Sequence, residues 1–135
     1  MEESKRKERY LDKINFILDK IENIPEFEDD IKRDAAFYRM QIAIETAMDI
    51  IAMLTKDVGG KVEDDYTNIS FLIEKKVLSK DLGEKLKELN GLRNIIVHKY
   101  NKVEEELIEE KRQFVFETLN EFVEVVENVI KKIFG

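Results

Sequence analysis

Apolar residues recur at intervals of three and four along most of the chain, which is the spacing of one face of an α-helix. The first such stretch begins near Ser4 and ends near Glu22, before Pro25. Its apolar positions are Leu11, Ile14, Ile17, Leu18 and Ile21. We therefore expect an amphipathic helix over residues 4–22.

A second helix is expected from a cap at Asp29 or Asp30 to about Lys56. Its interior, residues 35–54, is apolar over more than half of its circumference. A face this wide indicates a central helix that contacts several neighbours or a second subunit.

Two shorter helices are expected in the middle of the chain. Gly59 and Gly60 end the second helix, and Asp64 or Asp65 can cap a third. The inner side of this third helix carries Ile69, Leu72 and Ile73. Ser79 can cap a fourth helix, in which one stripe is formed by Leu82, Leu86, Leu89, Arg93, Ile96, Val97 and Tyr100.

Asn101 can cap a last helix that runs from about Val103 to Ile133. Its inner positions are Leu107, Phe114, Val115, Leu119, Phe122, Val126, Ile130 and Ile133. At roughly 1.5 Å per residue this helix would be about 45 Å long, longer than a small core needs. The excess length indicates apolar surface buried between subunits, and the alternative is a monomeric bundle whose last helix overhangs.

The composition agrees with a helical protein. The 135 residues include five glycines and one proline, and 39% are charged, mostly Glu and Lys, which favour helices. We predict an all-α fold, an up-and-down bundle of about five helices that forms a single domain over residues 1–135 and assembles as a dimer.

Several classes of site and location are disfavoured. The absence of cysteine rules out disulfides and thiolate metal sites, and a single histidine rules out a histidine-rich metal site. The acidic clusters 26–30, 63–65 and 104–106 lie at expected helix starts, where they favour the helix dipole, so we assign no metal and no cofactor. No segment has the length and apolarity of a signal peptide or a membrane span, which favours a cytoplasmic protein without membrane contact.

The segment from Arg93 to Tyr100 carries the candidate chemistry. Arginine can hold a phosphate through a fixed fork of donors, and histidine can move protons near neutral pH. On a regular helix Arg93 and His98, five residues apart, diverge by about 140°. Either the helix loosens near Val97 and His98, or Arg93 of one chain forms a site with His98 of another chain.

The pattern Arg93-Asn94, then His98 and Tyr100, at the end of the fourth helix resembles the R-x-x-x-x-H-x-Y motif of the HEPN superfamily. More closely, nearly the whole chain resembles HepT-type toxins, whose partner is the MNT minimal nucleotidyltransferase antitoxin. The resemblance implies a homodimeric, metal-independent endoribonuclease of a toxin–antitoxin pair. It implies Arg93 and His98 as the catalytic pair on an RNA substrate, Asn94 as a supporting polar residue, and Tyr100 as the residue that receives AMP from the antitoxin.

Alternatives remain open on the residues alone. Tyr100 can instead be a core aromatic or a stacking partner for a base. Glu45 and Asp49 share a helix face and can line a polar pocket opposite Arg93, or they can point to solvent or pair with Arg39 or lysine side chains. The net charge of −7 is unfavourable for a broad RNA-binding surface. It favours the alternative of a non-catalytic HEPN module that binds a nucleotide or a nucleotidyltransferase, and a purely structural adaptor is a third hypothesis.

Overall fold

A computed structural model describes residues 2–98 and 101–135 of the chain. The described residues form helices and no strands, in the order α1 (Glu2–Glu22), α2 (Asp30–Asp57), α3 (Asp65–Glu74), α4 (Lys80–Val97), α5 (Lys102–Glu110) and α6 (Arg112–Phe134). The all-α prediction is confirmed, with one helix more than expected. Within the described ranges no helix is both long and apolar enough to cross a membrane.

The helix starts follow from capping side chains that the sequence predicts. The side chains of Asp29, Asp64, Ser79 and Asn101 each accept a hydrogen bond from a backbone N–H in the first turn of α2, α3, α4 and α5. Asn101 and Glu104 form a reciprocal capping box. At the other end of α2, Gly59 adopts φ +88°, a left-handed conformation that glycine adopts without steric cost.

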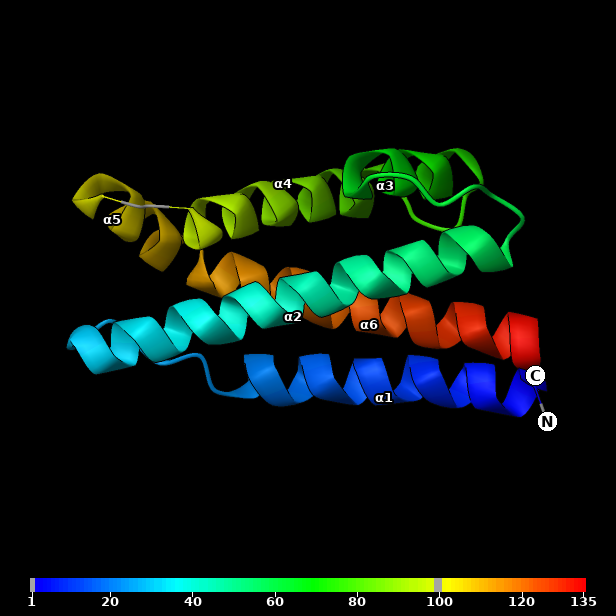
Figure 1. The fold of residues 1–135 in the computed structure, drawn as a ribbon, viewed down its shortest axis with the longest axis horizontal. Helices are drawn as coiled ribbons and strands as arrows, with labels where there is room; N and C mark the ends of the chain where they lie inside the picture. Colours follow the sequence, from blue (N-terminus) through cyan, green and yellow to red (C-terminus); the bar gives the residue numbers. More distant parts are fainter. Residues whose placement is uncertain (1, 99–100) are drawn as a thin grey trace.

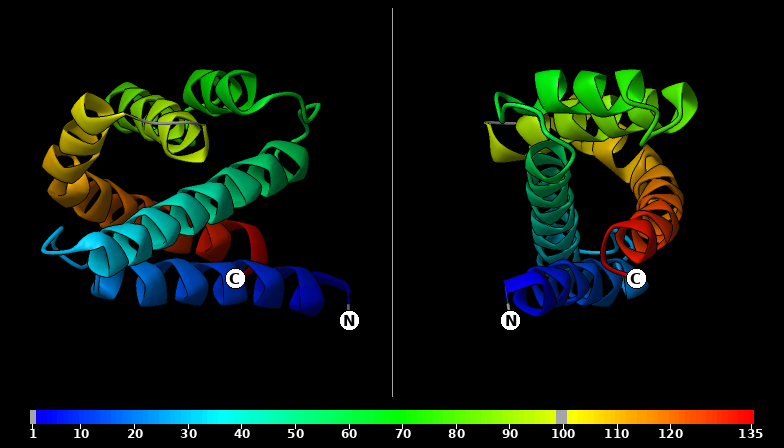
Figure 2. Two further views of the ribbon diagram at one scale, coloured as in Figure 1. Left: turned by 60° about the vertical axis from the view of Figure 1, so that its left-hand side comes forward. Right: turned by 90° about the vertical axis from the view of Figure 1, so that its right-hand side faces the viewer.

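The helices run up and down along one long axis (Figure 1). Helix α2 contacts α1, α3, α4 and α6, so its predicted central position is confirmed. Viewed along that axis, α1 lies on one side, α3 and α4 lie on the opposite side, and α2 and α6 lie between them (Figure 2). The start of α1 and the end of α6 lie at one end of the bundle, and α5 lies at the other (Figure 1).

One hydrophobic core runs through the bundle, and three predicted inward positions are wrong. In α1 the buried stripe is Tyr10, Ile14, Ile17 and Ile21, whereas Leu11 is exposed. The core stripe therefore begins one position earlier than predicted. In α4 Val97 is exposed because it lies in the last turn, one position past buried Ile96.

The predicted single last helix is wrong, because the chain bends at Lys111 between α5 and α6. Lys111 adopts φ −86° and ψ −2°, and its N–H is shared between the carbonyls of Leu107 and Ile108. Its Nζ donates to Glu88 of α4 at 3.0 Å. The bend buries Ile108 and leaves Leu107 exposed, the third position predicted incorrectly. Neither glycine nor proline marks this position, so tertiary contacts set the bend.

Candidate functional site

The predicted catalytic residues lie where α4 ends. Arg93 and Asn94 occupy its final turns, and the helix stops at Val97. His98 is the C-cap residue and has an extended backbone, with φ −85° and ψ 171°. The helix therefore ends before His98, which was one of the two ways to reconcile the spacing of Arg93 and His98.

Arg93 is held by a carboxylate of α2. Its Nε and Nη2 atoms each lie 2.9 Å from Oε2 of Glu45. Both side chains are about one-third exposed, at 32% and 35%, so the pair is open to solvent on one side. Gln41 also donates to the same oxygen at 3.3 Å. Of the two sequence interpretations of Glu45, the position opposite Arg93 is the correct one.

Asn94 links Arg93 to His98. Its side-chain Oδ1 accepts a hydrogen bond from Arg93 Nη1 at 3.0 Å. Its backbone carbonyl accepts a hydrogen bond from the His98 N–H at 3.1 Å. One residue therefore fixes the orientation of the guanidinium and the backbone position from which the imidazole projects.

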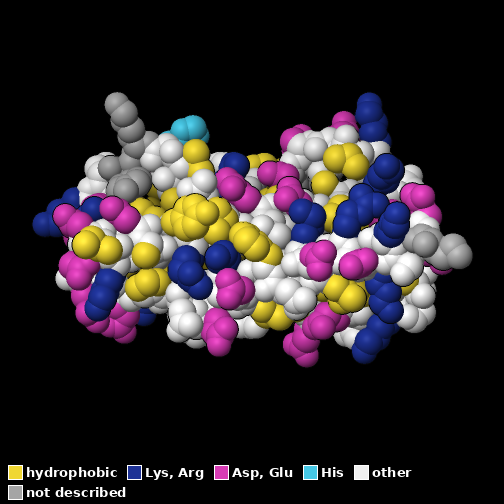
Figure 3. Space-filling model, turned by 60° about the horizontal axis from the view of Figure 1, so that its bottom comes forward, with side chains coloured by type: hydrophobic (Ala, Val, Ile, Leu, Met, Phe, Trp, Pro, Cys, Tyr) yellow, Lys and Arg dark blue, Asp and Glu magenta, His cyan; other side chains and the backbone are white. Residues whose placement is uncertain are grey.

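The His98 side chain is exposed, and the histidine stands at the surface in Figure 3, coloured cyan. Tyr100, the fourth predicted site residue, lies outside the described residues. Acidic and basic side chains are interspersed over the face seen in Figure 3, as expected for a chain with a net charge of −7. The surface in this view carries no uniform basic stripe.

A pocket of about 320 Å³ adjoins Arg93 between α2, α3 and α4. Glu45, Met48, Asp49 and Asp65 line it together with Arg93. Asp49 also pairs with Lys13 of α1 at 3.4 Å. Three carboxylates thus surround one guanidinium, although no group of carboxylates within residues 2–98 and 101–135 has the geometry of a metal site.

Asp65 was predicted only as a possible helix cap and was missed as a site residue. Burial raises the pKa of its carboxyl and the nearby Asp49 charge adds to this, while Arg93 lowers it. The actual cap is its neighbour Asp64, whose pKa is lowered by hydrogen bonds from the Thr67 backbone and hydroxyl. Two adjacent aspartates therefore have different roles, which their shared residue type does not reveal.

Comparison with known proteins places these features in a family. Residues 7–133 match the model of the ribonuclease HepT-like family. A protein of Archaeoglobus fulgidus, named as a candidate RNase, is 46% identical over 129 residues, covering 95% of this chain and 98% of its own. A second protein of that organism, with the same name, is 39% identical over 128 residues, covering 93% and 94%.

Solved structures share the fold. A chain in a crystallised MntA–HepT toxin–antitoxin complex with a tyrosine-to-alanine change gives a TM-score of 0.79 at 23% identity, covering 88% of this chain and 98% of that one. A chain in the complex of a tri-AMPylated HEPN toxin of Shewanella oneidensis with its MNT antitoxin gives 0.68 at 20% identity, covering 93% and 96%. The predicted HEPN-like architecture is thereby confirmed.

Proposed function

The chain belongs to the ribonuclease HepT-like family, and from this premise we propose that it is a toxin that cleaves RNA without a metal ion, using Arg93 and His98. The observation that carries the proposal is the Asn94 link, which holds the guanidinium of Arg93 beside the helix end that presents His98. The compartment proposed for this reaction is the cytoplasm.

The reaction needs a base and an acid. A base removes the proton of a ribose 2′-hydroxyl, the 2′-oxygen attacks phosphorus, and the bond to the 5′-oxygen breaks as that oxygen receives a proton. The products are a 2′,3′-cyclic phosphate and a 5′-hydroxyl. Because one imidazole cannot take both roles at once, we assign them to the His98 residues of two chains in a symmetric homodimer.

Apolar surface near the end of α4 supports the homodimer. Val97, next to His98 in the chain, is 47% exposed, and Val103 of α5 is 74% exposed. A groove of about 280 Å³ between α4, α5 and α6 is lined mainly by apolar residues, including Leu92, Ile95 and Phe114. Exposed apolar surface of this kind is typical of protein interfaces.

Arg93 is proposed to clamp the phosphate that is attacked. Its guanidinium stabilises negative charge that develops on the phosphate oxygens. In the structure its Nε and Nη2 are engaged by Glu45, so the substrate phosphate must displace that carboxylate or bind to the remaining N–H groups.

Tyr100 is proposed as the residue that an MNT-type nucleotidyltransferase antitoxin modifies. Its phenol oxygen attacks the α-phosphorus of ATP, and pyrophosphate leaves with the formation of a tyrosyl–AMP ester. Tyr100 is two residues from His98 in the chain, so the added anion would compete with RNA for the same cations. The Shewanella oneidensis relative is described as a tri-AMPylated toxin bound to an MNT antitoxin, which supports this assignment by similarity.

The test is RNA cleavage in EDTA by protein whose intact mass shows no adenylyl group. We expect cleavage by the wild type and none by His98→Ala. Lys80→Ala, a change at an exposed position at the other end of α4, is the control and should cleave normally. Equal cleavage by wild type and His98→Ala would assign the activity to a contaminant.

The second candidate is a non-catalytic HEPN module that binds a nucleotide or a nucleotidyltransferase partner. The acidic pocket around Arg93 favours it, because three carboxylates oppose the approach of a polyanion. If unmodified wild-type protein cleaves none of a broad set of RNAs, yet binds a nucleotidyltransferase, this candidate replaces the first.

A further inference from the structure

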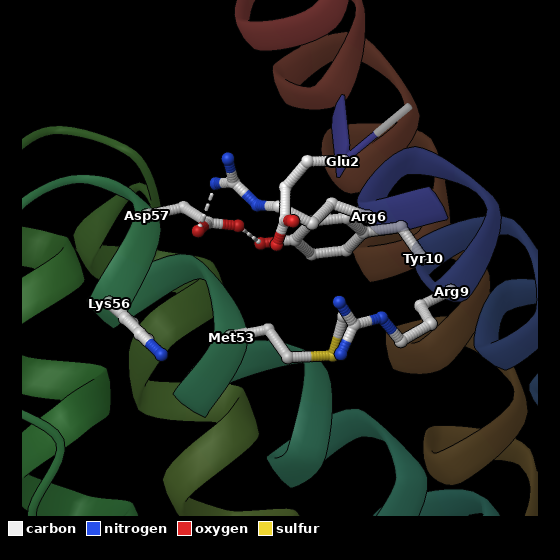
Figure 4. Close-up of a pocket in the computed structure, with 7 residues that line it drawn as sticks. All are labelled: Glu2, Arg6, Arg9, Tyr10, Met53, Lys56 and Asp57. Atoms are coloured by element: carbon white, nitrogen blue, oxygen red, sulfur yellow. Dashed lines mark hydrogen bonds and ion pairs between the residues drawn. The ribbon is translucent and has the colours of Figure 1, made fainter. Parts of the chain in front are cut away.

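A second pocket lies at the opposite end of the bundle from α5. It has a volume of about 520 Å³ and is lined by Glu2, Arg6, Arg9, Tyr10, Met53, Lys56 and Asp57. The lining positions have the spacing i, i+4, i+7, i+8 on α1 and i, i+3, i+4 on α2, so each set lies on one helix face. Two antiparallel helices therefore turn their polar faces towards each other here (Figure 4).

One wall of the pocket is a fixed network. Tyr10 is fully buried, and its hydroxyl donates to Oδ2 of Asp57 at 2.5 Å. Arg6 Nη2 donates to Oδ1 of the same carboxylate. Burial, and then the hydrogen bond to Asp57, raise the pKa of Tyr10 far above its usual range, so the phenol keeps its proton and remains a donor.

The network orients Arg6. The Arg6 guanidinium also lies over the ring of Phe134 in α6, with Cζ 5.3 Å from the ring centroid. Asp57 engages only Nη2, and no other hydrogen bond from the guanidinium to residues 2–98 or 101–135 is present. A guanidinium held from two sides, with donors still free, is preorganised to bind an anion.

Two further cations reach the pocket without a partner. Arg9 and Lys56 are exposed, and neither forms a hydrogen bond or ion pair with the described part of the chain. Figure 4 shows the Arg9 guanidinium beside the thioether of Met53, and Lys56 on the other side of Met53 with its amino group directed away from Arg6, Tyr10 and Asp57. Among the residues that line this pocket, the carboxylates are Asp57, which is already paired with Arg6, and Glu2.

We propose that this pocket binds an organic phosphate, with the phosphate group on Arg6, Arg9 and Lys56 and the organic part against Met53. The volume is that of sites for small ligands, roughly 300–1,000 Å³, and exceeds what a phosphate ion alone fills. The thioether of Met53 is an adaptable apolar surface for a planar or aliphatic body. This site is separate from the end of α4 and does not depend on RNA cleavage.

The test is calorimetric titration of the full chain at low ionic strength with AMP, ATP, inorganic phosphate and adenosine. We expect AMP or ATP to bind and adenosine to bind much more weakly. The double variant Arg9→Gln with Lys56→Gln should weaken binding by about tenfold or more, since it removes two charge-assisted contacts. Arg93→Gln should leave this binding unchanged, which separates the pocket from the proposed nuclease site.

The matched control is Lys80→Gln with Lys102→Gln, which removes the same charge at two exposed lysines outside the pocket. Thermal unfolding followed by circular dichroism verifies that all variants fold. Equal loss of affinity in both double variants, or no binding of any phosphate compound by the wild type, overturns the proposal. Binding of a short RNA through Arg9 and Lys56, without binding of AMP or ATP, also overturns it. If inorganic phosphate binds as tightly as AMP, the proposed contact of the organic part with Met53 is overturned, and only the contacts to the phosphate group stand.

Discussion

Arg93 and Arg6 both pair with a carboxylate of α2, and the two pairs differ in how the carboxylate is held. Glu45 accepts from two nitrogens of Arg93 through one oxygen, and its side chain is 35% exposed. Asp57 accepts from one nitrogen of Arg6, is only 12% exposed, and has its other oxygen bound by Tyr10. The first carboxylate, which also accepts from Gln41 of its own helix, is therefore held less firmly than the second, which is mostly buried and bound at both oxygens.

The charges that surround the two pairs also differ in sign. Asp49 and Asp65 place more negative charge beside Arg93, while Arg9 and Lys56 place more positive charge beside Arg6. An arginine in acidic surroundings is masked until a ligand or a rearrangement frees it. An arginine in basic surroundings, with an anchored partner, is ready to bind an anion at all times. Two similar arginine–carboxylate pairs thus present different electrostatic surroundings to an incoming anion.

The largest expected effect is on RNA cleavage. Arg93→Ala should reduce the cleavage rate by roughly 100-fold or more, the usual cost of removing a group that stabilises charge in the transition state. Arg93→Lys should recover only part of the rate, because an ammonium lacks the fork of donors. Arg6→Gln, the matching change in the other pair, should cleave normally in the same assay. Similar losses in Arg93→Ala and Arg6→Gln would remove the functional distinction between the pairs.

The next largest effect is on folding stability, through the hydrogen bond by which Tyr10 holds Asp57. Tyr10→Phe removes the only hydrogen bond that Oδ2 of Asp57 accepts within residues 2–98 and 101–135. The loss of this donor to a mostly buried carboxylate oxygen should lower the free energy of unfolding by about 1–2 kcal/mol. Denaturant unfolding measures the change. Tyr38→Phe, at a tyrosine that is 60% exposed, is the control and should be neutral. Equal stability of Tyr10→Phe and wild type would show that Asp57 needs no anchor.

A smaller effect is expected from lowering the negative charge beside Arg93. The double variant Asp49→Asn with Asp65→Asn should bind RNA about threefold to fivefold more tightly at low salt, roughly the Coulomb energy of nearby exposed charges. The gain should shrink as salt is raised, because salt screens these charges. Fluorescence anisotropy with a non-cleavable RNA, in the His98→Ala background, measures the affinity. Unchanged affinity at low salt would show that the acidic pocket does not mask Arg93.

The smallest expected effect is a difference between Asp64 and Asp65 in how each contributes to the pH dependence of stability. The pKa of Asp64 is lowered from its ordinary 3.8 by folding, so its stabilising contribution is complete above that pH and disappears as pH falls through the folded value. The pKa of Asp65 is raised from 3.8, so the fold loses stability as pH rises from 3.8 to the higher folded value, and the loss is complete above that value. The two contributions therefore have opposite signs.

Thermal unfolding between pH 3 and 7 tests these signs. Asp64→Ala should be less stable than wild type at pH 6 and approach it towards pH 3. Asp65→Asn should be slightly more stable than wild type at pH 6, and its advantage should vanish towards pH 3. Parallel pH profiles for both variants would contradict the assigned environments.

The sequence predicts helices and their starts well here, because capping is a local interaction. Asp29, Asp64, Ser79 and Asn101 act on N–H groups within a few residues, so each helix start could be predicted to within one residue. The bend at Lys111 could not be predicted in this way, since it depends on a contact with α4.

The candidate site was only partly predictable for the same reason. The place of Arg93, Asn94 and His98 at a helix end follows from local sequence, and their catalytic roles remain predictions. The pair of Tyr10 and Asp57 joins residues 47 positions apart, and periodicity does not predict such a pair. A tyrosine in line with Ile14, Ile17 and Ile21 was the available signal, because a buried hydroxyl needs a hydrogen-bond partner.

The bend at Lys111 also separates two helices that bury very different numbers of side chains. Helix α5 has nine residues and a single buried side chain, Ile108, whereas α6 buries seven. Isolated helices shorter than about 12 residues are marginal in water, so α5 depends on the burial of Ile108 and on the ion pair of Glu105 with Arg33 of α2 to stay docked. Its amide hydrogens should therefore exchange with solvent well before those of α2, through local opening that leaves the main core folded. The segment that follows the proposed active site is thus the part of the molecule that can reshape around a partner at the smallest cost in folding free energy.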